Sequence, residues 1–412
     1  MSFLFMVIMF GVSVQELNQR LDPISGLDTD KWVIPPRAVQ NRKSTRSVFR
    51  ITYQTPDAAL QGSHGRRSHH VNSQHYAMDG SLAIDPIAEL ITAYNELNSS
   101  AMDELDEEPS PLEFMRYVSR NAPFVVRKGA SRWPAARRWS TSFLKDALAG
   151  ETVNVAVTPK GNADAPTRLQ DGSLVFAKPW EEEQDFSEFL DFVIRQETEP
   201  SSSDDGNEIR YAQTQNDNLR NEYSTLFRHV QRDIPFARIA LQREPDAINM
   251  WIGNSRSVTA LHKDNYENVY VQVLGRKHFV LLPSLCHPCV NERRLAPATY
   301  ARRHGAAAGL ELRLDAGDAT PVPFALWDPD RPEEDATRYS PLACPVRVTL
   351  EPGDMMYLPS MWYHKVSQSC GDEGICVAVN YWYDMEFSGP LYPMSSFIRS
   401  VHLSQQENAK ME

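Results

Sequence analysis

The sequence predicts a mainly β fold, an antiparallel barrel or jelly roll with helices packed outside it. Three observations lead to this prediction. From about residue 248 the chain consists of short apolar runs separated by turns, and these runs do not alternate with helical segments. The 412 residues are 42% hydrophobic, which suffices for one large packed domain. A proline-rich stretch at about 288–342 interrupts the strands and is expected to be an irregular insert.

Residues 1–80 are predicted to form a disordered basic tail. The stretch 31–75 carries eight basic side chains against one acidic one and has no sustained hydrophobic period. Four histidines between residues 64 and 75 indicate a solvated linker rather than a metal site, because nothing nearby fixes a geometry. The apolar residues 1–14 lack the positive leading segment and cleavage site of a signal peptide, which disfavours secretion. The Arg- and Ser-rich stretch behind them leaves an organelle transit sequence open.

Residues 81–247 are predicted to be a region of helices and strands that packs on the barrel. At 84–97 apolar residues recur at helical spacing, and Pro86 is acceptable in a first helical turn. Ser140 or Thr141 is a suitable cap for a helix within 139–148. The other expected segments are an acidic loop at 99–111, helices at 111–120 and 185–194, strands at 123–129 and 152–159, and a surface loop at 201–208.

The barrel itself is expected within residues 248–387, where apolar and polar residues alternate over short runs. A C-terminal tail or helix is expected at 388–412. The predicted barrel strands lie at 248–253, 258–264, 268–275, 276–283, 344–354, 355–360, 364–369 and 376–385.

Charge and cysteine content limit the classes of function. Residues 81–412 hold 33 basic and 48 acidic side chains, a net charge of −15, which disfavours nucleic acid as the main partner and is compatible with a basic protein. Five cysteines do not make a disulfide framework, so we expect a reducing compartment, the cytoplasm and also the nucleus. Cys286 and Cys289 have zinc-like spacing without a second pair, which favours a loop with free thiols. No apolar run is long enough for a membrane span.

Two motifs far apart in the chain together indicate a metal site. His262 and Asp264 are two residues apart, so on a strand both side chains point to the same face. Taken alone, this pair is common by chance. His364 follows a turn and a strand at 353–364, which places a second histidine at another barrel strand. Two histidines and one carboxylate form the facial triad of non-haem Fe(II) oxygenases, which leaves coordination positions open.

Lys277 is a third candidate. It lies fifteen residues after His262, next to apolar and aromatic residues that indicate a buried strand. A buried lysine is costly unless an anion pairs with it, so a bound carboxylate would explain its position. A lysine that reaches the surface just past a turn would explain the sequence equally well.

Residues 249–283, 353–366 and 376–387 together resemble a jumonji-C domain. The upstream stretches 123–139 and 153–165 are similar to the small jumonji-C protein hydroxylases, and the resemblance extends over about 111–387. It implies a double-stranded β-helix of the cupin-like type with an N-terminal α/β extension, and an enzyme that uses Fe(II), 2-oxoglutarate and O₂. One departure from the family pattern is Met361, which stands where a turn glycine is usual.

The resemblance also assigns roles to single residues. It implies that Fe(II) binds to His262, Asp264 and His364. The positions that match those around the 2-oxoglutarate of relatives are Thr259, Lys277, Asn268, Tyr211, Tyr270 and Asn380.

The implied activity is hydroxylation of a lysyl side chain at C3, in a GTP-binding protein; the family also allows a homodimer. Three other enzymatic activities stay open: demethylation of a methylated lysine in a histone or another protein, modification of tRNA, and a peptidase activity. The last lacks a visible nucleophile or zinc set. A binding or scaffold protein without catalysis is disfavoured, because all three iron ligands are present.

Overall fold

The computed structural model describes residues 85–199, 208–303, 309–317 and 319–411. The expected basic tail at 1–80, the apolar leading residues and most of the expected surface loop at 201–208 lie outside this part of the chain. The described α-helices are α3 (Pro86–Leu97), α4 (Pro111–Arg120), α5 (Pro134–Arg138), α6 (Thr141–Ala147), α7 (Phe186–Thr198), α8 (Pro235–Leu241) and α9 (Leu391–Met411). Short 3₁₀ helices are η1 (Ser224–His229), η2 (Ser284–Cys289) and η3 (Ser340–Leu342).

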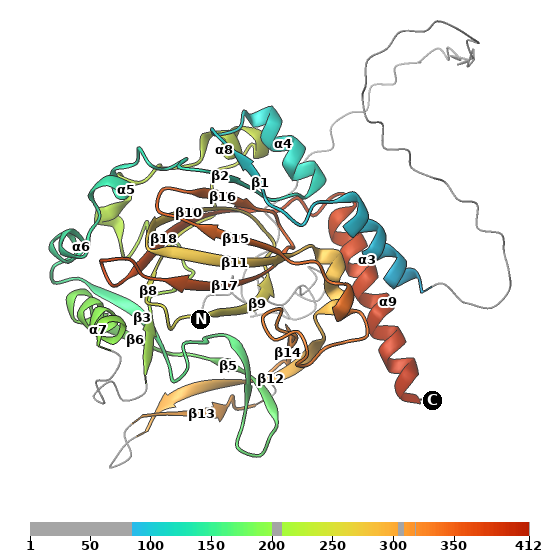
Figure 1. The fold of residues 1–412 in the computed structure, drawn as a ribbon. Coiled ribbons are helices and arrows are strands. Elements are labelled where there is room, and N and C mark those ends of the chain that lie inside the picture. The colour runs from blue at the N-terminus through green and yellow to red at the C-terminus, as the bar shows by residue number, and fades with distance from the viewer. Residues whose placement is uncertain (1–84, 200–207, 304–308, 318, 412) are drawn as a thin grey trace, which may run out of the picture. The chain divides into compact units, whose positions relative to one another are not determined.

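Two facing sheets form the barrel, which confirms the predicted jelly roll (Figure 1). The larger sheet has, in order, β1 (Asp103–Leu105), β2 (Phe124–Val126), β16 (Met355–Leu358), β10 (Tyr266–Leu274), β18 (Cys376–Asp384) and β8 (Ala247–Gly253). The smaller sheet has β15 (Val346–Leu350), β11 (Arg276–Leu282), β17 (Tyr363–Ser369) and β9 (Thr259–Lys263). Along each of the two runs β8 to β11 and β15 to β18, successive strands fall in opposite sheets, as in a double-stranded β-helix.

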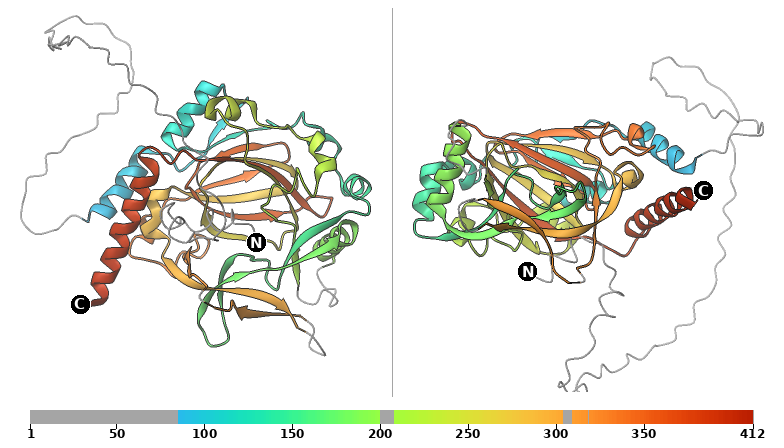
Figure 2. Two further views of the ribbon diagram at one scale, coloured as in Figure 1. Left: turned by 180° about the vertical axis from the view of Figure 1, so that it is seen from behind. Right: turned by 90° about the horizontal axis from the view of Figure 1, so that it is seen from below.

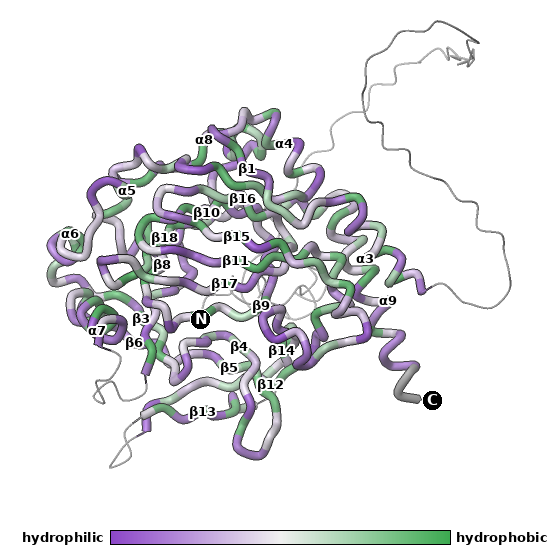
Figure 3. The backbone as a smooth tube through the Cα atoms, in the orientation of Figure 1, coloured by the Kyte–Doolittle hydropathy of each residue, from purple (hydrophilic) through white to green (hydrophobic). Residues whose placement is uncertain are grey.

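The period of two along each strand decides which side chains enter the barrel. On β18, Val379 and Tyr381 face outward into a core shared with the helices, whereas Ala378 and Trp382 face inward toward the smaller sheet. On β10 the same alternation sends Val269 outward. Figure 3 shows that the barrel strands carry both hydrophobic and hydrophilic residues. The inward positions of the larger sheet therefore include the expected site residues of β10 and β18.

Helices α4 to α8 cover the outer face of the larger sheet, where Phe114 and Phe189 join its core. The region before residue 247 also contributes strands. Within the expected acidic loop at 99–111, β1 pairs in parallel with β2, and β2 pairs with the barrel strand β16. That segment was expected to be a loop, and its three-residue strand forms because β2 provides the hydrogen-bonding edge.

A separate three-stranded sheet consists of β6 (Trp180–Asp185), β3 (Thr152–Thr158) and β7 (Ile209–Tyr211). Directly after β7, Ala212 forms a bridge with Ile252 of the barrel strand β8. This bridge brings the end of β7 to the barrel.

The insert expected at 288–342 lies between the barrel strands β11 and β15 and outside both barrel sheets, but its predicted irregular character is wrong. This segment contains β12 (Glu292–Arg302), β13 (Leu310–Leu314) and β14 (Val322–Ala325). Strand β12 pairs in parallel with β5 (Leu174–Lys178), which in turn pairs with β4 (Ala165–Arg168). The prolines obscured the alternation of apolar and polar residues in β12. Its partner strand β5 lies more than a hundred residues away, so no local pattern predicted this sheet.

The segment with the two zinc-spaced cysteines is the 3₁₀ helix η2, not a loop. Both Cys286 and Cys289 are buried free thiols in an apolar cluster beneath this helix. Helices α3 and α9 both contact η2, and Figure 2 shows α9 from two further sides. Of the helices in the described part of the chain, none combines the length and apolar character needed to cross a membrane.

Candidate active site

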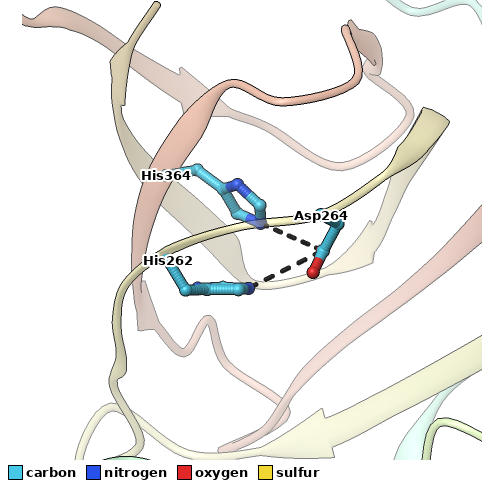
Figure 4. Close-up of side chains that lie close together, drawn as sticks. All are labelled: His262, Asp264 and His364. Atoms are coloured by element: carbon cyan, nitrogen blue, oxygen red, sulfur yellow. Dashed lines mark ion pairs between the residues drawn. The ribbon is translucent and has the colours of Figure 1, made fainter. Parts of the chain in front are cut away.

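Two adjacent strands of the smaller sheet bring together the two predicted histidines and the aspartate (Figure 4). His262 on β9 lies opposite His364 on β17 in antiparallel register, and Asp264 follows β9 on the same side as His262. The Asp264 Oδ2 atom lies 3.7 Å from His262 Nε2 and 3.6 Å from His364 Nε2. One potential ligand atom from each residue lies within 4.8 Å of the others.

Backbone carbonyls fix the proton on each imidazole. His262 Nδ1 lies 2.8 Å from the Ala260 carbonyl oxygen, and His364 Nδ1 lies 3.0 Å from that of Trp362. Because a carbonyl can only accept, each Nδ1 carries the hydrogen and each Nε2 presents a lone pair. Burial also lowers the pKa of His364 well below its ordinary value, so this ring is neutral.

The donor set fits a divalent cation. Burial raises the pKa of Asp264, an effect that the neighbouring His262 only partly opposes. Two imidazole nitrogens and a carboxylate oxygen converge here, and a metal ion would supply the positive charge that balances the buried carboxylate. Nitrogen and oxygen donors at three positions suit Fe(II) and leave the remaining coordination positions open.

The turn before His364 holds the backbone of Asp264. Met361 donates its backbone N–H to the Asp264 carbonyl oxygen at 2.8 Å. Met361 has a φ of 67°, a left-handed conformation in which glycine is usual and a side chain is strained. The replacement of the expected glycine thus keeps the turn geometry, at a cost of about 1 to 2 kcal/mol.

A buried ammonium group forms another part of the site. Lys277 of β11 is 2% exposed, and its Nζ donates to the Tyr211 hydroxyl at 2.8 Å. No carboxylate forms an ion pair with Lys277 in the described residues. Burial raises the pKa of both Tyr211 and Tyr270, so both are neutral phenols that cannot balance the lysine charge. A bound carboxylate would balance it.

Gly253 allows this arrangement. A Cβ atom at Gly253 would lie 2.6 Å from the Tyr211 ring, which is closer than any real contact. Strand β8 therefore needs a glycine here so that Tyr211 can reach Lys277.

A directional chain of hydrogen bonds orients two asparagines. The Trp251 indole donates to Asn380 Oδ1 at 2.9 Å, and Asn380 Nδ2 donates to Asn268 Oδ1 at 3.1 Å. The two amide oxygens are thus occupied, and the Asn268 amide nitrogen keeps its capacity to donate. These residues lie on β8, β18 and β10, which are adjacent in the larger sheet.

The structure places all nine predicted site residues around one pocket. Sequence reasoning missed other residues of its wall. Trp382, Phe279 and Val366 each lie two positions after a predicted residue, so strand periodicity could have indicated them. Gln213, Gln215 and Asp164 also line the pocket, but they belong to segments outside the barrel, and no pattern in the sequence announced them.

The comparisons with known proteins agree with this geometry. The sequence profile of the cupin-like domain matches residues 109–389. The "Lysine-specific demethylase JMJ32" of Arabidopsis thaliana is 39% identical over 310 residues, which covers 73% of this chain and 86% of that protein. This chain belongs to the cupin-like JmjC proteins. Members of this family are oxygenases that depend on Fe(II) and 2-oxoglutarate, and the three grouped ligands are those such a protein requires.

Two further relatives cover most of their own length. The human "Bifunctional peptidase and (3S)-lysyl hydroxylase JMJD7" is 36% identical over 70% of this chain and 85% of its own. The "JmjC domain-containing protein E" of Dictyostelium discoideum is 30% identical over 76% of this chain and 94% of its own. The names of the Arabidopsis and human relatives thus state different activities, and the name of the Dictyostelium relative states none.

Proposed function

We propose that this JmjC protein hydroxylates a lysyl side chain of a protein substrate. The observation that supports this most is the combination, in one pocket, of the His262, Asp264 and His364 ligand set with a buried lysine that lacks an anionic partner. We place the hydroxyl group at C3 of the lysine, as the name of the human relative states for that protein. As the target we propose a GTP-binding protein.

Each part of the pocket has a task in this reaction. His262, Asp264 and His364 would hold Fe(II), while Lys277, Tyr211 and Thr259 would bind the distal carboxylate of 2-oxoglutarate, and Asn268, Tyr270 and Asn380 would line its site. When bound, Fe(II) and 2-oxoglutarate would supply the oxidation of a C–H bond to C–OH by O₂, with release of succinate and CO₂. The protein orients these groups and keeps water away, because Trp251, Phe279 and Trp382 provide apolar pocket walls.

A demethylase is the second candidate, because the relative with 39% identity bears that name. The same oxidation of an N-methyl group would give an unstable product that releases formaldehyde. Both reactions need the same metal site, so the substrate and not the triad distinguishes them.

We further propose a cytoplasmic protein that is also present in the nucleus and acts as a homodimer on a basic protein. The absence of disulfides among its five cysteines supports a reducing compartment. The charge of −15 on residues 81–412 supports a basic protein partner and disfavours nucleic acid.

Mass spectrometry of peptides would test the reaction. Lysine-containing peptides, including segments of GTP-binding proteins, are incubated with the enzyme, Fe(II), ascorbate and 2-oxoglutarate. A gain of about 16 Da on an unmodified lysine supports hydroxylation, and a loss of about 14 Da on methylated peptides alone supports demethylation. Conversion of 2-oxoglutarate to succinate with neither change would contradict both proposals and leave an oxygenase with another substrate.

A further inference from the structure

Asp164 is an acidic residue in the wall of the same pocket, and it belongs to none of the groups assigned above. It lies between β3 and β4 and has a φ of 53°, a strained conformation for a residue with a side chain. The loop before it is tied to the metal-binding strand, since Val258 donates its N–H to the Gly161 carbonyl at 2.8 Å, one residue before β9 begins.

Close contact fixes this loop. A Cβ atom at Gly161 would lie 2.0 Å from the Arg256 carbonyl oxygen, so the two backbones touch. Gly161 has a φ of 69°, which favours glycine for a second reason. The position of Asp164 relative to the strand of His262 is therefore built into the fold.

The carboxylate of Asp164 forms no ion pair with any side chain in the described ranges. Gln213 donates a hydrogen bond to it at a long 3.4 Å. Burial raises the pKa of Asp164 to about 7, and Lys178 opposes this only partly. The Lys178 ammonium makes its own ion pair with Asp315 at 2.6 Å.

Asp164 is a half-buried acid in the wall of the pocket, and no cation of the described residues forms an ion pair with it. A ligand that brings an ammonium group into the pocket would supply the missing partner. We infer that Asp164 binds the side-chain ammonium of the target lysine and selects an unmethylated lysine as the substrate. This inference rests on the hydroxylase function proposed above and names the group that recognises its substrate.

The aromatic residues of the pocket support selection against methylated lysine. A trimethylammonium group is bound by open faces of aromatic rings, whereas it has no N–H to donate to a carboxylate. In this pocket the rings pack on one another: Trp382 stacks on Tyr266 with centroids 5.0 Å apart, and Trp251 meets Trp382 at 71°. Each of these two indoles thus has a protein ring against it, and the rings do not form an open cage around the Asp164 carboxylate.

Binding of small lysine analogues tests the inference without a known target sequence. The full-length protein, loaded with Mn(II) and 2-oxoglutarate so that turnover is blocked, is titrated with N-acetyl-lysine methylamide, its Nε-trimethyl form and N-acetyl-norleucine methylamide. Ligand-observed NMR gives the three dissociation constants. We expect the lysine analogue to bind about tenfold to a hundredfold more tightly than the norleucine one, as for a charge-assisted hydrogen bond.

The decisive variant is Asp164→Asn, because asparagine tolerates the left-handed backbone and keeps the shape of the side chain. The preference for lysine over norleucine is expected to fall to within twofold in this variant, and Asp164→Glu should restore part of it. Asp171→Asn is the matched control, since Asp171 lies on the exposed turn between β4 and β5 and bonds only within that turn. It should keep the full preference.

The outcomes separate the inference from the proposed function. Equal binding of lysine and norleucine analogues to the wild-type protein, equal binding of the trimethyl form, or an unchanged preference in Asp164→Asn would each overturn the role of Asp164. Failure of the proposed function would appear elsewhere, as absence of the 16 Da gain on any lysine peptide. A lysine preference that depends on Asp164 would support the ammonium site even then.

Discussion

Two charged side chains of opposite sign line the pocket, and they come from different parts of the molecule. Lys277 belongs to a central strand of the smaller sheet, where its backbone pairs with Leu350 on one side and Gln368 on the other. Asp164 belongs to a loop between strands outside the barrel. The cationic Lys277 thus lies on a strand that is paired on both sides, whereas the anionic Asp164 lies in the loop between β3 and β4.

This difference matches two kinds of ligand. In the proposed function, the barrel strand β11 provides a fixed charge for the co-substrate 2-oxoglutarate. A loop can change its sequence and length without disturbing the barrel, so it is the natural place for a group that recognises one target. We therefore expect substitutions at the two charges to affect different substrates of the same reaction.

The largest effect is expected at the triad, on which both substrates depend. His262→Ala or Asp264→Ala should abolish metal binding and turnover, a larger loss than the tenfold to hundredfold typical of residues that only support a ligand. Metal content and succinate production measure this. His278→Gln is the matched control, since His278 bonds to Thr349 and Ser369 and does not line the pocket. Full activity of either triad variant with added iron would contradict the ligand assignment.

The second largest effect is expected at Lys277 and concerns only the requirement for 2-oxoglutarate. Lys277→Ala should raise the 2-oxoglutarate concentration needed for half-maximal turnover by about a hundredfold, because it removes one partner of a buried charge pair. Steady-state kinetics with varied 2-oxoglutarate measure the change. Arg276→Ala, on the same strand but paired with Glu351 at the surface, should change it less than twofold. An unchanged requirement in Lys277→Ala would place the carboxylate elsewhere.

The third effect is a pH dependence of the KM for a lysyl peptide, caused by the ionisation of Asp164. The pKa of Asp164 is raised to about 7 by burial and by Glu181, while Lys178 and Gln213 oppose the shift. The acid ionises as pH rises through this value, whereas a lysine remains protonated. The KM for a lysyl peptide should therefore fall about tenfold between pH 6 and pH 8.

The Asp164→Asn variant isolates this titration from that of other groups. Its KM should lose the tenfold dependence over the same pH interval, while the Asp171→Asn protein should keep it. A wild-type KM that rises with pH would have the wrong sign for an ammonium bound by Asp164.

The smallest effect is expected from the loss of the hydrogen bond that Gln213 donates to Asp164. Gln213→Ala removes the hydrogen bond of 3.4 Å to the carboxylate, so the KM for a lysyl peptide at pH 7 should rise only about threefold. Because this bond lowers the pKa of Asp164, its loss should also move the midpoint of the pH profile upward. A midpoint that moves downward would mean that Gln213 does not stabilise the ionised form.

The sequence by itself determined the elements whose signals are local. The alternation of apolar and polar residues and the turns between the runs predicted the eight barrel strands. Helix α3 begins after Asp85, whose carboxylate caps its first turn. The spacing of His262 and Asp264 placed both on one face of a strand, and the buried character of β11 made Lys277 a candidate for an anion. These features depend on the period of two and on the cost of burying charge, which are readable within a few residues.

Only the tertiary structure decided the features that join distant segments. The pairing of β12 with β5 converts a proline-rich stretch into a sheet strand, and the register of β17 on β9 sets His364 opposite His262. Tyr211 meets Lys277 from a strand outside the barrel, and Asp164 enters the pocket wall from a loop. No local pattern encodes these contacts, because each depends on which strands find one another across a hundred residues or on a loop held against the barrel.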